Sequence, residues 1–128
     1  MTLARSATQF VAGLALATAV FASAPAFART PYDGNWSVLI VTKSGPCDQA
    51  FRYGLSIRNG AVFYEGSASV NVAGRVKTGG YVDVRVSAGS QGADGTGRLG
   101  KTYGEGSWRG TGSMGTCLGT WTAERRAR

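Results

Sequence analysis

Apolar and polar residues alternate over much of the chain after residue 34, which is the pattern of β-strands with one buried face. Residues 51–58 show it most clearly, because aromatic and aliphatic side chains occupy every second position between Arg52 and Arg58. No stretch after residue 28 keeps a helical period for two turns. Turns with glycine recur about every ten residues, which is typical of an antiparallel barrel or sandwich. The pattern therefore predicts an all-β protein.

The dipeptide Asn59-Gly60 predicts a tight hairpin. A type I′ turn needs positive φ angles at both central residues, and Asn-Gly is the sequence that favours it most. With this turn, Ile57 lies opposite Val62 and Leu55 lies opposite Tyr64. The apolar faces of the two strands then agree.

A second hairpin, around residues 78–80, can be drawn in two registers. A two-residue loop would set Val76 against the carboxylate of Asp83. A three-residue loop pairs Val76 with Val82 and places Arg75 opposite Asp83, so that both faces of the hairpin are satisfied. We therefore predict the three-residue loop.

Residues 92–119 contain ten glycines in 28 positions. A flexible, low-complexity segment is one interpretation. However, the glycines recur at every second position and share faces with Trp108 and Trp121, where they would leave room for the indole rings. We interpret the segment as three short, curved strands, which brings the total to eight. A closed barrel is the first choice of architecture, and a two-sheet sandwich is the alternative.

The three tryptophans, Trp36, Trp108 and Trp121, all fall on predicted inward faces. They could line a ligand cavity. Side chains nearly fill the interior of a small eight-stranded barrel, so we interpret them as core residues.

The first 28 residues have the layout of a secretory signal peptide. Arg5 gives a basic start, residues 10–21 form a short uncharged apolar run, and Ala26-x-Ala28 offers small residues for cleavage. A membrane anchor is the alternative, but a bilayer span needs about 20 apolar residues. We expect a periplasmic or secreted protein with no membrane span after cleavage. Residues 29–128 then form one domain, with a basic tail at residues 124–128 that we expect to be frayed.

Cys47 and Cys117 are the only cysteines. An exported protein meets an oxidising compartment, so we predict that they form a disulfide. Closing a loop of this length stabilises the fold by roughly 4.4 kcal/mol in the chain-entropy estimate. The bridge would also bring the first and last strands together, as a closed barrel requires. Two reactive thiols are the alternative, but the pair lacks the C-x-x-C spacing.

The inventory of catalytic side chains is small. The chain contains no histidine, which removes the commonest general base and the commonest metal ligand. Six of the seven carboxylates are scattered singly, and Asp83 is expected to pair with Arg75. The glycine-rich segment lacks the Gly-Lys-Ser/Thr ending of a phosphate loop. We therefore expect no enzymatic activity, no metal and no cofactor.

Basic residues outnumber acidic ones by 14 to 7, a net charge of +7. Several of them share the predicted outer face with two aromatic residues and form a candidate binding face: Arg52, Arg58, Phe63, Arg75, Lys77, Tyr81 and Arg85. An ordinary solvated surface is one interpretation. The other is a site for anionic polymers of the cell envelope, such as lipopolysaccharide or acidic polysaccharide. Nucleic acid fits less well, because the aromatic residues are not interleaved as a stacking platform.

Several short segments together resemble a group of small exported β-domain proteins of alphaproteobacteria, especially rhizobia. They are residues 32–38, Cys47 with residues 51–53, residues 108–110 and residues 117–125. Some proteins of this group carry labels concerning haem utilisation. A haem role suits this chain poorly, because only tyrosines or Met114 could serve as axial ligands.

A second likeness concerns architecture. Gly34-x-Trp36 at the first strand, with Arg125 and Arg126 after the last, is similar to the lipocalin, avidin and bacterial metalloprotease-inhibitor barrels. The resemblance implies that a late arginine covers the first tryptophan. Fold likeness does not transfer a ligand.

These observations lead us to expect an exported, non-enzymatic binding module that recognises anionic envelope or extracellular polymers through the basic outer face. The alternative is a small barrel that binds a small ligand or inhibits a secreted protease. In that case the contacts would come from the loops at residues 42–49 and 111–115.

Overall fold

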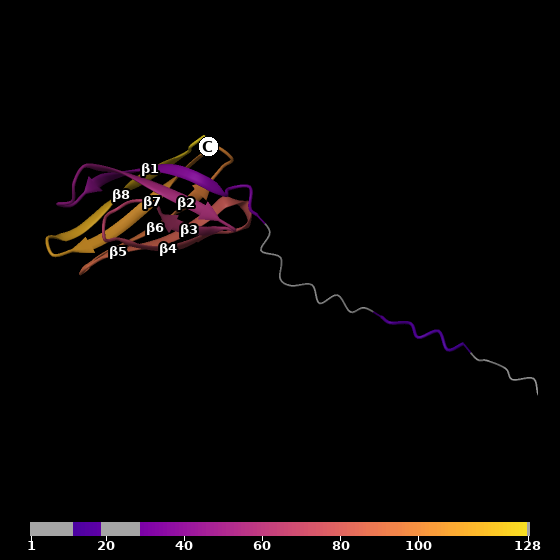
Figure 1. The fold of residues 1–128 in the computed structure, drawn as a ribbon. Helices are drawn as coiled ribbons and strands as arrows, with labels where there is room; N and C mark the ends of the chain where they lie inside the picture. The colour runs from indigo at the N-terminus through magenta and orange to yellow at the C-terminus, as the bar shows by residue number, and fades with distance from the viewer. Residues whose placement is uncertain (1–11, 19–28, 128) are drawn as a thin grey trace, which may run out of the picture.

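The computed structural model describes residues 12–18 and 29–127 and shows a closed antiparallel barrel of eight strands (Figure 1). Each strand pairs with the next one along the chain, and the last returns to pair with the first. The all-β barrel is thus confirmed, and the sandwich alternative is wrong. The strands are β1 (Gly34–Ser44), β2 (Ala50–Arg58), β3 (Ala61–Tyr64), β4 (Asn71–Val76), β5 (Tyr81–Ala88), β6 (Gln91–Leu99), β7 (Tyr103–Gly112) and β8 (Gly115–Arg125).

Residues 12–18 are exposed and form no regular secondary structure. The rest of the predicted signal peptide, residues 1–11 and 19–28, lies outside the described residues. Within the part of the chain that is described, no helix has the length and apolar character needed to cross a bilayer.

The β2–β3 hairpin has the predicted turn and register. Asn59 and Gly60 have φ angles of 52° and 80°, as a type I′ turn requires. Ile57 lies opposite Val62, and Leu55 lies opposite Tyr64. Local turn chemistry therefore sets which side chains of these strands face the barrel interior.

The β4–β5 hairpin adopts the predicted three-residue loop, which forms a single 3₁₀ turn, η1 (Thr78–Gly80). Val76 lies opposite Val82, and Arg75 lies opposite Asp83. The ion pair that we expect between Arg75 and Asp83 is not present among the described residues. Arg85 pairs with Asp94 instead, with 3.1 Å between Nη1 and Oδ1. Both side chains of that pair are well exposed, so it contributes little to stability.

The glycine-rich segment forms β6, β7 and β8, which have 9, 10 and 11 residues and are therefore not short strands as predicted. Its glycines do make room for tryptophan. A Cβ atom on Gly97 would stand 2.5 Å from Cζ2 of Trp121, and one on Gly106 would stand 2.6 Å from Cε2 of the same ring. Because these two glycines have no side chain, β6 and β7 can pass close to the ring of Trp121. The regular pairing of the two strands therefore continues past the ring without interruption.

The barrel closes where β1 meets β8, from Trp36 opposite Arg125 to Thr42 opposite Gly119. The basic C-terminus takes part in this closure. β8 continues through Arg125, and the N–H of Arg126 donates to the carbonyl oxygen of Asn35 at 2.8 Å. The expectation of a frayed tail is therefore wrong as far as residue 126, because these residues are held by backbone pairing.

The best-buried apolar side chains form one cluster toward the end of the barrel where β1 begins. Trp36 and Trp121 belong to it, whereas Trp108 packs against it and is only partly buried. The buried members of the cluster are Trp36, Val38, Ile57, Val62, Val76, Leu99, Trp121 and Ala123.

Candidate functional site

One end of the barrel is closed by a cap around Trp36. The indole N–H of Trp36 donates to the carbonyl oxygen of Tyr32 at 2.8 Å. The guanidinium carbon of Arg125 lies 5.0 Å from the centre of the Trp36 ring. Arg125 also donates to the carbonyl oxygens of Pro31 at 2.8 Å, Asp33 at 2.7 Å and Lys101 at 2.8 Å. The arrangement implied by the Gly-x-Trp likeness is thus present, with Arg125 as the covering residue.

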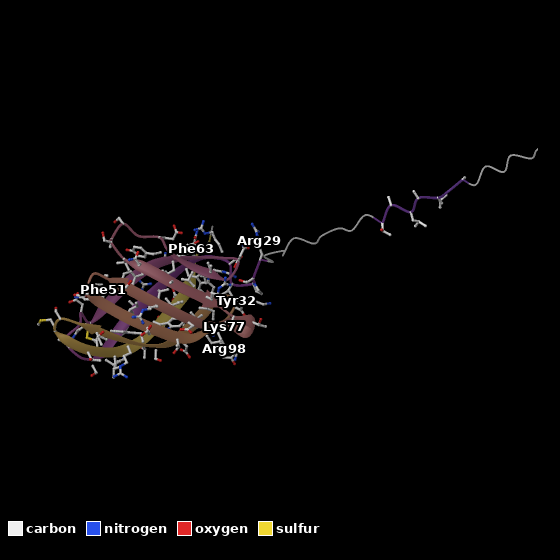
Figure 2. The ribbon with its side chains drawn as sticks, turned by 90° about the horizontal axis from the view of Figure 1, so that it is seen from below. Arg29, Tyr32, Phe51, Phe63, Lys77 and Arg98 are labelled. Atoms are coloured by element: carbon white, nitrogen blue, oxygen red, sulfur yellow. A yellow bond between two sulfur atoms is a disulfide. The ribbon has the colours of Figure 1, made fainter. Side chains whose placement is uncertain are left out.

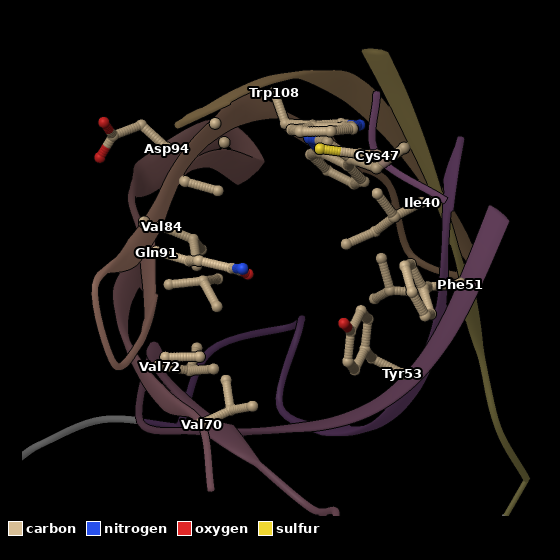
Figure 3. A pocket seen from close by; sticks show the side chains of 18 of the residues that line it. Ile40, Cys47, Phe51, Tyr53, Val70, Val72, Val84, Gln91, Asp94 and Trp108 are labelled. Atoms are coloured by element: carbon tan, nitrogen blue, oxygen red, sulfur yellow. The ribbon is translucent and has the colours of Figure 1, made fainter. Parts of the chain in front are cut away.

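The other half of the barrel interior is hollow (Figure 3). The cavity has a volume of about 440 Å³ and extends from the buried cluster to the opposite end of the barrel. We expected side chains nearly to fill this space, and that expectation is wrong. The reason lies mainly in β6, where Ala93 and Gly95 occupy inward positions, and a Cβ atom on Gly95 would have no neighbour closer than 3.7 Å. Gly95, Gly110 and Gly112 are among the lining residues.

The open end, which we call the mouth, is formed by the loops that join β1 to β2, β3 to β4, β5 to β6 and β7 to β8. Residues near these loops line the part of the cavity that is closest to the mouth. Two apolar lining residues in this part, Phe51 and Met114, are exposed. The loops at residues 42–49 and 111–115 both contribute to it, and the predicted protease contact through them stays a prediction.

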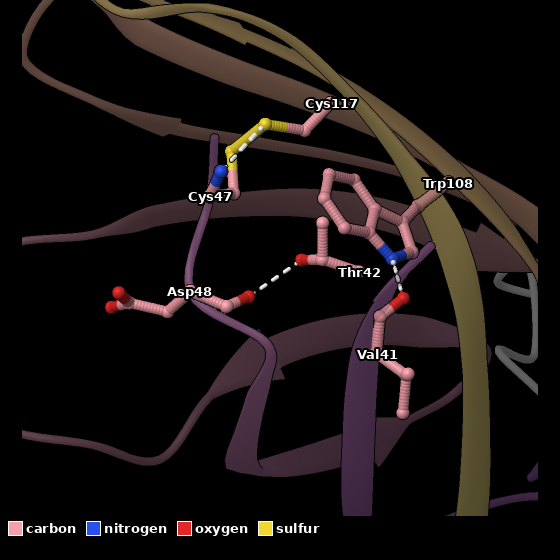
Figure 4. The surroundings of a disulfide bond; sticks show 6 residues. All are labelled: Val41, Thr42, Cys47, Asp48, Trp108 and Cys117. Atoms are coloured by element: carbon pink, nitrogen blue, oxygen red, sulfur yellow. Dashed lines mark hydrogen bonds between the residues drawn. A yellow bond between two sulfur atoms is a disulfide. The ribbon is translucent and has the colours of Figure 1, made fainter. Parts of the chain in front are cut away.

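The predicted disulfide between Cys47 and Cys117 is confirmed and lies at the mouth (Figure 4). Cys117 is fully buried on β8, and Cys47 lies in the β1–β2 loop, where its N–H contacts the Cys117 sulfur at 3.2 Å. The hydroxyl of Thr42 donates to the carbonyl oxygen of Asp48 at 2.6 Å. The bridge and this hydrogen bond hold the loop beside Trp108, whose own N–H donates to Val41. The loop that carries Asp48 is therefore fixed to the barrel wall at two points.

The cavity wall is apolar in its depth and gains polar groups toward the mouth. Valines of β4 and β5, Leu55, Trp36 and Trp121 form the deeper wall, and Ile40 and Trp108 line it nearer the mouth. Tyr53, Tyr64, Gln91 and Asp48 supply the polar groups. None of the described lining residues is a lysine or an arginine. Such a space suits an apolar molecule that carries a polar group at one end.

Comparisons with protein-family models, with curated proteins and with solved structures found no match.

Tyr53 is the titratable group on the cavity wall whose surroundings perturb it. Burial raises its pKa above the ordinary value of 10.0, and the nearby Tyr64 and the carboxylate of Asp48 raise it further. Its ring packs edge-on against Tyr64, with 6.1 Å between ring centres. The phenol is therefore neutral at physiological pH and available as a hydrogen-bond donor to a ligand.

The outer basic residues are only partly brought together. Five of the seven predicted residues lie toward the capped end, on β2, β3, β4 and β5 or directly after β4: Arg58, Phe63, Arg75, Lys77 and Tyr81. Arg98 joins them, because it lies opposite Tyr81 on β6. Figure 2 shows Lys77 and Arg98 near the end where residue 29 enters the barrel, and Phe51 toward the mouth. We call the group of Arg58, Phe63, Arg75, Lys77, Tyr81 and Arg98 the basic arc.

Two cation–aromatic contacts organise the basic arc. The guanidinium of Arg58 lies 4.1 Å from the ring centre of Phe63, and that of Arg98 lies 4.8 Å from the ring centre of Tyr81. Both aromatic rings are exposed. The structure therefore presents flat rings and positive charges on one surface.

Arg52 and Arg85 do not belong to the basic arc. Arg52 lies between the mouth and the cap on β2 and donates to the hydroxyl of Ser37 at 3.0 Å. Arg85 is paired with Asp94. Arg52 and Arg85 are thus set apart by their positions nearer the mouth on β2 and β5 and by their own partners, which alternation along single strands does not reveal.

Sequence reasoning missed Tyr53, Tyr64, Gln91 and Asp48 as a group. The available signal was the run of glycine and alanine at inward positions of β6. Small residues on that strand leave the opposite wall, β2 and β3, facing empty space.

Proposed function

We propose that this protein is an exported, non-enzymatic binding protein that holds a small, largely apolar ligand inside the barrel. The observation that carries the proposal is the cavity of about 440 Å³, which is apolar in its depth and open at the mouth. Binding pockets for small molecules commonly measure about 300–1,000 Å³ and combine apolar walls with a few polar groups.

Energetics support a ligand in this space. An unfilled cavity deprives its lining atoms of contacts, and the loss grows with the volume that stays empty. An apolar cavity also offers water few partners, whereas an apolar molecule restores the missing contacts. At about 440 Å³ the space corresponds to roughly 15 volumes of liquid water, which points to a ligand with on the order of 15 non-hydrogen atoms.

The disulfide supports export. A structural disulfide forms and persists in oxidising compartments outside the cytoplasm. The bridge between Cys47 and Cys117 also fixes the mouth of the cavity. A site that depends on this bridge suits a protein that works in the periplasm or outside the cell.

The test uses octan-1-ol as a small apolar probe and nuclear magnetic resonance of the oxidised protein. We expect saturable shifts in residues of the cavity wall. Val84→Trp should weaken binding at least tenfold, because the indole would occupy the cavity that Val84 lines. Thr96→Trp adds the same ring at an exposed position of β6 and serves as the matched control. Shifts that do not saturate, or that persist unchanged in Val84→Trp, would count against a ligand in the barrel.

A second candidate function rests on the basic arc, as the predicted site for an anionic envelope polymer. The observation that favours it is the pair of exposed cation–aromatic contacts, Arg58 on Phe63 and Arg98 on Tyr81. The rings hold the two guanidinium groups in place, where they can meet carboxylates or phosphates of a polymer.

Immobilised lipopolysaccharide and polygalacturonate test this candidate at low and at physiological salt. Reversal of charge at Arg58, Lys77 and Arg98 to Glu should abolish retention at physiological salt. The same reversal at Arg52, Arg85 and Arg109, an exposed residue of β7, changes the net charge equally outside the basic arc. Equal loss in both variants would mean that only the overall charge attracts the polymer.

A further inference from the structure

We propose that the mouth selects a ligand with a positively charged head group, an alkylammonium or a similar cation, above an apolar body that fills the cavity. The inference rests on the proposed function and names the ligand class of that same site.

The charge of the cavity wall is negative. The lining residues that carry a charge are Asp48 and Asp94, and both are acidic. Asp94 is paired with Arg85 on the outer face of the barrel, with 3.1 Å between Nη1 of Arg85 and Oδ1 of Asp94. Asp48 is exposed and forms no ion pair with any described residue. Asp48 is therefore the charge that a head group at the mouth would meet.

A row of aromatic rings descends from the mouth into the cavity. The centres of Phe51 and Tyr53 are 6.0 Å apart, and those of Tyr53 and Tyr64 are 6.1 Å apart. Figure 3 shows Phe51 and Tyr53 side by side on one wall. Faces of aromatic rings attract cations, and sites for alkylated ammonium groups combine such rings with a carboxylate.

The electrostatic field of the Asp48 carboxylate reaches this row of rings. The carboxylate contributes to the raised pKa of Tyr53, because its charge disfavours a second negative charge on the phenol. The same field disfavours an anionic head group and favours a cationic one. A carboxylate ligand would meet this field and find no lining lysine or arginine to neutralise it.

The net positive charge of the protein does not reverse this preference. The basic arc lies toward the capped end, and exposed charges farther apart than about 8 Å are largely screened at physiological ionic strength. Two further charged residues near the mouth, Lys43 at the end of β1 and Glu65 directly after β3, have opposite signs and do not line the cavity. The carboxylate of Asp48 therefore decides the sign at the mouth.

The experiment compares three probes with one tail and different heads: octylammonium, octan-1-ol and octanoate, each below its aggregation concentration. The oxidised protein is titrated with each at pH 7 and physiological salt. We expect octylammonium to bind about three- to tenfold more tightly than octan-1-ol, and octanoate to bind more weakly than octan-1-ol, as for one partly exposed carboxylate aided by aromatic rings.

Asp48→Asn should remove the preference for octylammonium while leaving the affinity for octan-1-ol within twofold. Asp83→Asn removes a carboxylate from the outer face of β5 and should leave all three affinities in their original order. A drop in the octylammonium preference of equal size in both variants would show that only the net charge matters, and would overturn the inference.

The two proposals fail in different ways. If octan-1-ol binds in a manner that Val84→Trp abolishes, but octanoate binds as tightly as octylammonium or more so, the head-group inference is overturned and the cavity function stands. If none of the three probes binds saturably, the cavity function fails and the inference fails with it.

Discussion

Arg125 near the end of β8 covers Trp36 near the start of β1, with its guanidinium carbon 5.0 Å from the ring centre. The same side chain satisfies three backbone carbonyl groups of the segments that close this end of the barrel. One residue thus joins the first strand, the last strand and the segment that precedes the first strand. The capped end depends on the planar shape of the guanidinium as well as on its charge.

Substitution of Arg125 should therefore destabilise the barrel. Arg125→Ala removes three hydrogen bonds from a charged donor and the cation–aromatic contact, and we expect a loss of about 2 kcal/mol in the free energy of unfolding. Arg125→Lys should recover only part of it, because an ammonium group cannot reproduce the fork. Urea unfolding measures both. Arg126→Ala is the control, because Arg126 binds Asn35 through its backbone N–H. An equal loss of stability in Arg126→Ala would contradict the role of Arg125.

The glycines of β7 should not tolerate even a methyl group where Trp121 passes. In Gly106→Ala the new Cβ atom would lie 2.6 Å from Cε2 and Nε1 of Trp121 and would also clash with the carbonyl oxygen of Thr96. We expect a loss of more than about 2 kcal/mol, as for an overpacked core. Near-ultraviolet circular dichroism should report the displaced ring. Gly92→Ala is the matched control, because its nearest neighbour would be at an ordinary 3.7 Å.

Removal of the disulfide should lower stability by about 2–4 kcal/mol, since the bridge limits the unfolded chain over a long loop. The variant Cys47→Ala/Cys117→Ala, unfolded in urea, measures the loss. We also expect weaker binding of octan-1-ol, because the loop that carries Asp48 loses one of its two attachments to the wall. A variant that binds as tightly as the oxidised protein would show that the loop is ordered without the bridge.

Asp33 makes the capped end sensitive to acid. Burial alone would raise its pKa, but hydrogen bonds from Thr30, Asn59 and Gly60 outweigh that effect and hold the pKa below the ordinary value of 3.8. A carboxyl group whose pKa is lower in the folded state stabilises the fold above its unfolded pKa. This contribution is lost as the pH falls below about 3.8 and through the folded value.

Urea midpoints between pH 2 and pH 7 test this expectation. The Asp33→Asn variant should have a lower urea midpoint than the native chain at pH 7. Its urea midpoint should also fall less than that of the native chain between pH 4 and pH 2. An outer-face variant, Asp83→Asn, should keep the native fall. The role of Asp33 would be disproved by an acid profile that stays unchanged when it is replaced.

Local sequence patterns determine much of this fold. Asn59-Gly60 sets one register, the choice between Val82 and Asp83 as partners of Val76 sets another, and the alternation of glycine with polar residues places the tryptophans inward. These features depend on neighbours in the chain. For that reason they could be predicted without knowledge of the whole barrel.

The cavity and the grouping of outer residues depend on the barrel as a whole. Its internal width follows from the number, tilt and stagger of the strands, which no single strand encodes. Whether Tyr53 faces a side chain or empty space is decided by glycine and alanine on β6, across the barrel. Arg85 is engaged by Asp94 on β6, a cross-strand partner that the alternation along β5 does not show.

The order of the strands has a consequence for how the chain folds. Every pairing except that of β1 with β8 joins neighbours in the sequence, so seven of the eight pairings can form as local hairpins. The β1–β8 seam must wait for the two ends of the chain to meet, which costs loop-closure entropy and slows folding. The Cys47–Cys117 bridge, once formed, holds those ends near each other even in the unfolded chain. We therefore expect the oxidised protein to refold faster than the Cys47→Ala/Cys117→Ala variant in stopped-flow experiments, since its slowest encounter has already taken place.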